Sequence, residues 1–304
     1  MKSYSSNKIL DSTENGWYNK RVNRWEVITM GKNIVKVKLD IIFKKLFEDK
    51  NNEDLLHDFL SSLLDIPYDD IKQIVIQNSE ILPDSITGKF SRLDLRMSVD
   101  NRLVNCELQI SWEEAYADRS VFYWAKLYTG ELKSGEEYDK LKQTISINII
   151  NFNMFETPDF HSVFKLIDPK TGTQLTDKCA IHFFELKKIN KQVNKNNRKE
   201  LWLQLINAES EEELDMLQQT NVQPIQKAVM IIHQMSDDEK IQELARLREK
   251  ALHDEASALS SARKEGALET LADLVRDGII TLQEGARRAN MSVSEFEAKT
   301  GLKA

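Results

Sequence analysis

The chain has 304 residues, and its 42 Lys and Arg against 49 Asp and Glu give a formal net charge of −7. This length suits about two domains with a sizeable core, and the acidic balance argues against a protein coated with nucleic acid, although it allows a local basic patch. Two cysteines and five scattered histidines exclude a disulfide scaffold, argue against zinc and suit a reducing cytoplasm. No apolar run has the length of a membrane span, and the N-terminus lacks a signal-peptide pattern.

The hydrophobic pattern divides the chain into regions of different character. Residues 1–33 are polar and aperiodic, which predicts a flexible arm; an alternative is that the native chain starts at Met30. We expect an α/β domain with an added hairpin over 34–190, a helical region over 191–265 and a small helical tip over 266–304.

Within the α/β domain, apolar residues at helical spacing alternate with strand-like runs. The expected elements are helices over 39–47 and 55–64 closed by Pro67, strands over 71–77, 91–99 and 102–110, a helix over 112–133 ended at Gly135, and a buried strand over 143–152. A hairpin over 158–188 follows.

From about residue 198 onward, apolar residues recur at helical spacing. Residues 236–265 are rich in Glu, Lys, Arg and Ala, which suits an extended helix that pairs with a copy of itself in a homodimer. Thr281 and Ser292 can cap two short helices in the tip. These resemble a helix-turn-helix, but Glu295 and Glu297 make the second helix a poor major-groove reader, so an interaction tip is an equal alternative.

The strongest chemical signal lies in the hairpin over 91–110. If Asp100 and Asn101 form a two-residue turn, opposed residues sum to 201 and Asp94 faces Glu107. Opposed residues share a face with Cβ atoms about 5 Å apart, so burying the apolar face puts two carboxylates side by side. Such a pair favours a hard cation such as Mg²⁺ or Mn²⁺. The alternative is a solvated face on which Arg92 and Arg96 neutralise the acids.

Two further segments suit contact with nucleic acid. Tyr116, Arg119, Tyr123 and Lys126 form one stripe on the helix after the hairpin, which suits stacking and phosphate contact; the alternative is an amphipathic helix that half-buries its rings. Residues 187–199 carry cations without an acidic residue, and the alternative there is a solvated loop. The cations of this run are Lys187, Lys188, Lys191, Lys195, Arg198 and Lys199.

Asp94, followed by Glu107-Leu108-Gln109 on the next strand, resembles the signature of PD-(D/E)XK nucleases. The wider pattern resembles the Rpn family of recombination-promoting nucleases, often labelled transposases. The resemblance runs over roughly 34 to 270. It includes LDIIFKKLF at 39–47, YWAKLYTGELKSGEEYDKLK at 123–142, ISINII at 145–150, IHFFELKK at 181–188, AVMIIHQMSDDEK at 228–240 and RLREKALHDEASALSSARKEG at 246–266.

This resemblance implies a restriction-endonuclease-like αβββαβ core with a mixed sheet flanked by helices, which cuts DNA with Mg²⁺, or with Mn²⁺ or Ca²⁺. By similarity, Asp94, Glu107 and the carbonyl of Leu108 bind the metal. Asp40 completes the shell through water, or alternatively caps its helix. Gln109 stands where many of these enzymes carry Lys, so it can orient water or phosphate but supplies no charge. Leu93 replaces the Pro of the motif.

Two other functions share these features. The neutral Gln109 allows a DNA-binding or scaffold protein with a decayed site, and the same nuclease chemistry suits a toxin-like defence effector. The sequence shows no three-carboxylate transposase pattern.

Overall fold

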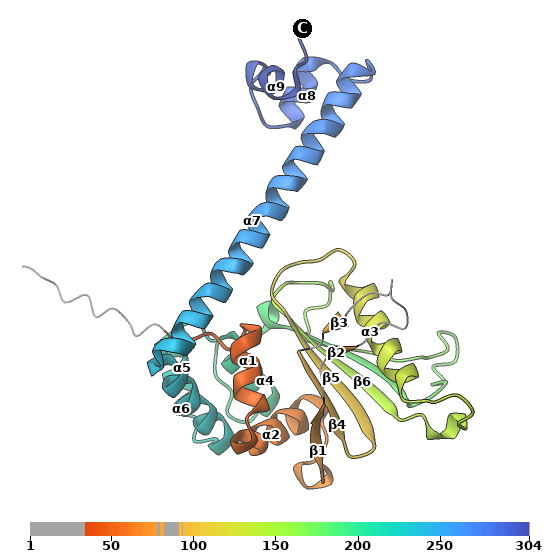
Figure 1. The fold of residues 1–304 in the computed structure, drawn as a ribbon, viewed down its shortest axis with the longest axis vertical. Coiled ribbons are helices and arrows are strands. Elements are labelled where there is room, and N and C mark those ends of the chain that lie inside the picture. Colours follow the sequence, from red (N-terminus) through yellow and green to blue (C-terminus); the bar gives the residue numbers. More distant parts are fainter. Residues whose placement is uncertain (1–33, 78–79, 82–90, 93, 304) are drawn as a thin grey trace, which may run out of the picture.

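The computed structural model describes residues 34–77, 80–81, 91–92 and 94–303. The arm expected over 1–33 and the motif residue Leu93 lie outside these residues. The described chain forms a mixed six-stranded sheet covered by helices, with a long helix that projects from it (Figure 1). No helix in this part of the chain is long and apolar enough to cross a membrane.

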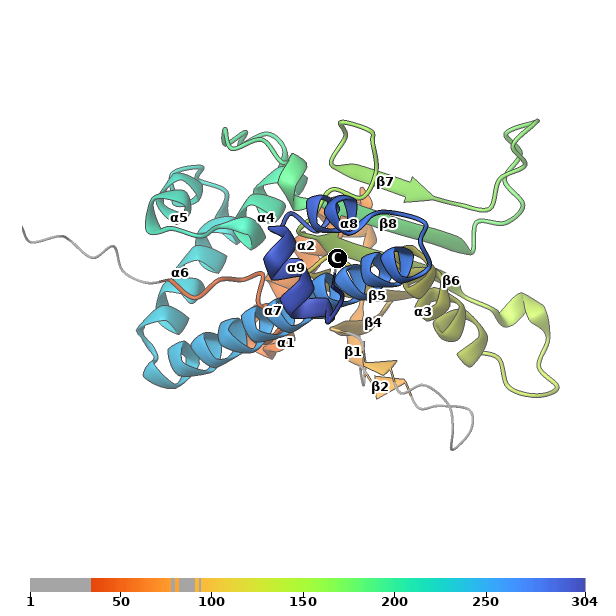
Figure 2. The same cartoon turned by 90° about the horizontal axis from the view of Figure 1, so that it is seen from above.

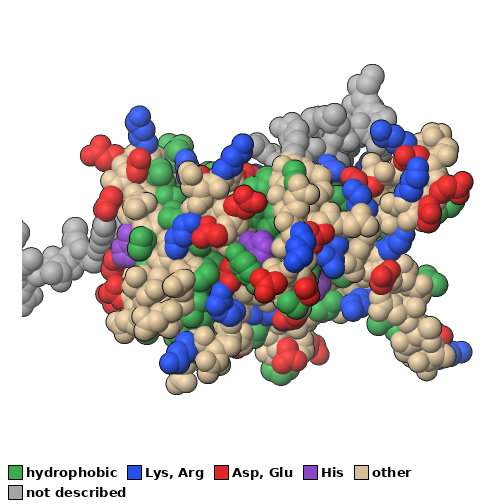
Figure 3. Space-filling model, turned by 90° about the horizontal axis from the view of Figure 1, so that it is seen from below, with side chains coloured by type: hydrophobic (Ala, Val, Ile, Leu, Met, Phe, Trp, Pro, Cys, Tyr) green, Lys and Arg blue, Asp and Glu red, His purple; other side chains and the backbone are tan. Residues whose placement is uncertain are grey.

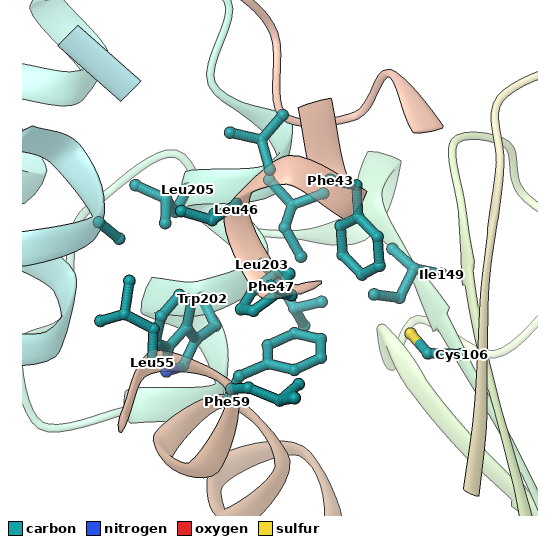
Figure 4. Close-up of a cluster of buried hydrophobic side chains, with 14 of the residues drawn as sticks. Phe43, Leu46, Phe47, Leu55, Phe59, Cys106, Ile149, Trp202, Leu203 and Leu205 are labelled. Carbon is teal, nitrogen blue, oxygen red and sulfur yellow. The ribbon is translucent and has the colours of Figure 1, made fainter. Parts of the chain in front are cut away.

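Two predicted N-terminal helices are present as α1 (Asp40–Glu48) and α2 (Glu53–Leu64). Their apolar residues recur at three and four positions, so each helix buries one face. Asp65 ends α2 in the left-handed conformation, two residues before Pro67. Phe43, Phe47 and Phe59 meet between these helices in edge and tilted ring contacts at 4.6–6.1 Å (Figure 4).

The main sheet has the strand order β1-β4-β5-β6-β8-β7. The β1, β4 and β5 strands are antiparallel, β5, β6 and β8 are parallel, and β7 runs antiparallel to β8. The expected α/β class with a mixed sheet is therefore confirmed, and the expected hairpin over 158–188 extends the main sheet. The strands are β1 (Ile74–Gln77), β4 (Leu95–Val99), β5 (Arg102–Gln109), β6 (Gln143–Ile150), β7 (His161–Phe164) and β8 (Cys179–Glu185).

The first predicted strand and the predicted helix after the hairpin are both shorter than expected. The first strand begins at Ile74 because the Asp100 carboxylate accepts the N–H groups of Lys72 and Gln73 at 2.9 Å, which replaces strand pairing there. The helix expected over 112–133 is α3 (Tyr116–Gly130). Gly135, at a φ of 86°, lies in the turn that follows and does not end the helix.

Helices α4 (Arg198–Asn207), α5 (Glu211–Gln218) and α6 (Gln223–Asp237) share one hydrophobic core with α1, α2 and the sheet. Trp202 of α4 packs at 5.7 Å from both Phe47 and Phe59 (Figure 4). The predicted domain boundary at residue 190 therefore separates segments that share a core.

The extended helix is α7 (Glu239–Arg276), which has 38 residues and continues through Gly266, so the predicted boundary at 265 falls inside it. It packs against α1 and, in the view from above, crosses over the sheet near β5 (Figures 1 and 2). Thr281 and Ser292 cap α8 (Leu282–Arg288) and α9 (Val293–Thr300) as predicted. These two helices pack with the end of α7 in a separate apolar cluster.

Candidate functional site

The hairpin register brings Asp94 and Glu107 together. Leu95 pairs with Cys106 and each following pair keeps the predicted sum, so the register is confirmed over β4. The continuous strand expected over 91–99 is wrong at Asp94, which forms a bend because its Oδ2 accepts the N–H of Leu108 at 2.8 Å. Before this bend, β3 (Ser91–Arg92) pairs instead with β2 (Glu80–Ile81).

Both carboxylates lie in a cavity of about 390 Å³ between α1, β5, α3 and α7. Glu107 is 9% exposed, and its Oε1 has no hydrogen-bond partner among the described residues. Burial and the neighbouring Asp94 raise the pKa of Glu107 well above its usual range, and burial likewise raises the pKa of Asp94. Two desolvated carboxylates share this cavity without a cation hydrogen-bonded to Glu107 in the described structure. The cavity is lined by Asp40, Ile41, Lys44, Asp94, Glu107, Leu108, Gln109, Arg119, Tyr123 and Arg248.

This donor set fits a hard divalent cation that keeps part of its water shell. Magnesium typically binds proteins through one or two carboxylates and takes its other ligands from water and phosphate. The unpartnered Oε1 of Glu107 and the adjacent Asp94 provide that pair. Among the described residues, no group of three or more His, Cys, Asp or Glu side chains could hold a metal ion, so the protein offers no closed cage.

Asp40 lines the cavity but is already paired. The Nε of Arg248 on α7 lies 2.8 Å from its Oδ1. The alternative capping role does not apply, because Leu39 is the N-cap residue and no side chain caps α1. Arg248 was missed in the sequence because 208 residues separate it from Asp40 and nothing in the local pattern connects them.

Gln109 lines the cavity, and both ends of its side-chain amide are engaged in hydrogen bonds. Its Nε2 donates to the carbonyl of Ser111 at 2.8 Å, and its Oε1 accepts from Arg119 at 2.7 Å. The cation that acts on both carboxylates from α1 is Lys44, which lowers the pKa of each against the effect of burial. The spacing of four residues from Asp40 was a signal for Lys44, since such residues share a helix face.

The predicted stripe on α3 divides into buried and accessible parts. Tyr116 is 1% exposed, and its hydroxyl donates to Asn148 at 3.2 Å, so its role in DNA contact is corrected to one in the core. The Arg119 guanidinium covers this ring at 4.7 Å and reaches the cavity, where Tyr123 joins it. Lys126 lies over the Phe122 ring at 6.0 Å and does not line the cavity.

The cations of the predicted basic run over 187–199 also fall into two groups, those that the protein itself binds and those that are exposed. Lys188 donates to the carbonyls of Phe155 and Thr157 at 2.7 and 2.6 Å and pairs with the buried Glu185, so its predicted DNA contact is corrected to a structural role. Lys187 and Lys191 are exposed, but neither lines the cavity.

Of the remaining cations of this run, Lys195 is exposed and two have acidic partners. Arg198 pairs with Asp58, and Lys199 pairs with Asp65 at 2.7 Å. On the face shown in Figure 3, Lys and Arg side chains are interspersed with Asp and Glu side chains.

Arg96 does not neutralise Asp94 and Glu107, which was the alternative interpretation of this face. Its guanidinium lies 3.6 Å from Glu131. The side chain of Arg92 lies outside the described part of the structure.

The mixed six-stranded sheet with flanking helices is that of a restriction-endonuclease-like α/β domain. Residues 37–262 match the family model described as PD-(D/E)XK nuclease family transposase, which is more than half of the chain, and the chain therefore belongs to this family. Comparisons with curated proteins and with solved structures find no significant match.

Proposed function

We propose that the protein is a metal-dependent DNA endonuclease that hydrolyses phosphodiester bonds and promotes DNA recombination in the cytoplasm. The observation that carries this proposal is that Asp94, just before β4, and Glu107 on β5 line one cavity in a chain of the PD-(D/E)XK family. Nucleases of this superfamily generally use divalent metal ions.

Asp94, Glu107 and the main-chain carbonyl of Leu108 would hold Mg²⁺, or Mn²⁺ or Ca²⁺ in its place. When bound, such an ion polarises a phosphate oxygen and lowers the pKa of a water molecule. The chain's own contribution is to fix the two carboxylates: the hydrogen bond from Leu108 orients Asp94, and the sheet orients Glu107.

Cations from three elements surround the proposed phosphate position. Lys44 comes from α1, Arg119 from α3 and Arg248 from α7, and all three line the cavity. Preorganised cations stabilise negative charge that develops on a phosphoryl group. Gln109 is neutral and engaged with Arg119, so it cannot supply the positive charge that a Lys at this position gives many of these nucleases. We assign that role to Lys44. Asp40, held by Arg248, would contact the ion through water.

DNA would approach the cavity past Arg119 and Tyr123, with the exposed Lys187 and Lys191 as more distant phosphate contacts. With a net charge of −7, the chain would bind DNA through a small number of local cations, so we expect binding that weakens steeply with salt.

Cleavage of supercoiled plasmid tests the proposal directly. Wild-type protein should nick or linearise the plasmid with Mg²⁺, Mn²⁺ or Ca²⁺, and Asp94→Ala should not. Equal cleavage by both proteins would contradict the site. The engaged Gln109 favours a second candidate, a DNA-binding scaffold without activity, and DNA retention without cleavage under every metal would select it.

A homodimer through the C-terminal helices is also proposed. Leu244 and Leu247 on α7 are each 48% exposed and lie three residues apart, so they share one face of the helix. A molar mass from light scattering equal to one chain would contradict the dimer.

A further inference from the structure

A second groove of about 330 Å³ continues from the catalytic cavity. The two share Asp40, Leu108, Gln109, Arg119 and Arg248, so the groove begins where the proposed phosphate position ends. One wall is the segment that leaves β5 toward α3, and the other is the side of α7 that faces it (Figure 1).

Each wall of this groove carries apolar side chains. Trp112 is 42% exposed, and an edge contact with Phe152 at 5.2 Å and 81° supports its ring. Leu252, Ala256 and Leu259 of α7 line the opposite wall, and Leu259 is 51% exposed. A supported, exposed indole facing aliphatic side chains suits a flat, apolar ligand.

The charges of the groove argue against a phosphate as its occupant. Its cations are matched in number by its acids, so the groove presents little net charge. A neutral aromatic group is favoured over an anion in such a site. The charged lining residues are Lys38, Arg119, Arg248, Asp40, Glu113 and Glu255.

We propose that this groove binds an unpaired nucleobase of the cleaved strand, stacked on Trp112, and that the enzyme therefore acts on DNA with a single-stranded or unpaired nucleotide at the cut. This inference rests on the proposed nuclease function, because that function places the phosphate next to the groove. A base is joined to its phosphate through one sugar, so a phosphate at Asp94 and Glu107 leaves the adjoining base within reach of the shared lining. A base between two protein walls is separated from its partner strand.

Binding of a labelled single-stranded oligonucleotide, measured by fluorescence anisotropy in a metal chelator, tests the groove without any cleavage. The comparison ligand has the same backbone with abasic sugars. Stacking on an aromatic side chain contributes about 1–3 kcal/mol per base, so wild type should prefer the intact oligonucleotide by roughly 5- to 150-fold. Trp112→Ala should remove most of this preference, and Trp112→Phe should restore much of it.

Tyr138, which is 79% exposed and lies outside both cavities, provides the matched control. Tyr138→Ala should keep the wild-type preference. If Trp112→Ala does not fold by circular dichroism, Leu259→Ser decides, because it removes the opposite wall from an exposed position. A preference for intact over abasic DNA that survives in the folded Trp112 or Leu259 variant overturns the inference.

The two proposals fail in different ways. If the base preference depends on Trp112 but no metal supports plasmid cleavage, the groove stands and the nuclease proposal fails. If cleavage depends on Asp94 but intact and abasic DNA bind equally, the nuclease stands and the groove assignment fails.

Discussion

The main-chain N–H of Leu108 donates a 2.8 Å hydrogen bond to the carboxylate of Asp94 and so ties the start of β4 to the end of β5. Without this bond Asp94, which precedes the paired part of β4, would have no strand partner to position it. The bond places its carboxylate beside Glu107, where burial and the Asp94 charge raise the pKa of Glu107, and burial raises the pKa of Asp94. Holding two desolvated carboxylates close together costs free energy, and a cation bound between them would offset that cost.

Lys44→Ala should lower the rate of plasmid cleavage by about 10²–10³-fold, the usual effect of removing one preorganised electrostatic group. Lys44 acts on both carboxylates, whereas its neighbour Lys45 is exposed and does not line the cavity. Lys45→Ala is therefore the matched control and should cleave at the wild-type rate. Equal rates for the two variants would remove Lys44 from the site.

Arg248→Ala should reduce the rate of cleavage by about 10- to 100-fold, because it removes the group that orients Asp40, which would contact the ion through water. The variant leaves Asp40 without its 2.8 Å partner and loosens the contact of α7 with the cavity. Arg246, two residues earlier, is exposed and pairs with Glu243 on its own helix. If Arg246→Ala and Arg248→Ala show the same kinetics, α7 has no part in catalysis.

Glu107→Gln should stabilise the metal-free protein while it abolishes cleavage. The substitution removes a carboxylate whose ionised form is disfavoured by burial, as its raised pKa indicates. Denaturant unfolding in a chelator should therefore give a higher free energy of unfolding than that of the wild type. Glu114→Gln, at an exposed position, should change it by less than ~0.5 kcal/mol. A destabilised Glu107→Gln would indicate a structural role for this carboxylate.

The sequence predicted the pairing register of the hairpin correctly, because the alternation of apolar and polar residues and the length of the turn together determine it. The sum of 201 followed from Asp100 and Asn101 and the apolar face, and the ladder from Leu95 onward confirms it. Capping at Ser292 was predicted for the same reason, since the signal lies within one helical turn.

The sequence did not reveal which side of a stripe faces the core or which distant residues meet. Tyr116 and Tyr123 share a stripe, yet the sheet buries only Tyr116, whose hydroxyl bonds to Asn148. Lys188 belongs to a basic run, but Glu185 three residues earlier binds it. The pairing of Arg248 with Asp40 depends on the tertiary position of α7, which no local period encodes.

Acid should destabilise the protein through two adjacent histidines. His161 Nε2 lies 3.0 Å from His182 Nδ1, and burial, with Lys199 nearby, lowers the pKa of each to about 4 from 6.5. Between these values the unfolded chain binds protons that the folded chain does not. The stability that depends on these two neutral histidines is therefore fully present above pH 6.5. The free energy of unfolding decreases as the pH falls from 6.5 toward 4.

His182→Gln should reduce this loss of stability, measured by denaturant unfolding across the same pH range. His253 has an 82% exposed side chain, so His253→Gln should keep the wild-type dependence. An unchanged slope in His182→Gln would show that other groups cause the acid sensitivity.

Calorimetric titration with Mn²⁺ tests most directly whether Asp94 and Glu107 hold a metal. Wild type should show a saturable site, which Asp94→Asn and Glu107→Gln should lose and which Asp118→Asn, at an exposed position on α3, should retain. Mn²⁺ binding that is equal in all four proteins would contradict the metal site and, with it, the proposed nuclease mechanism.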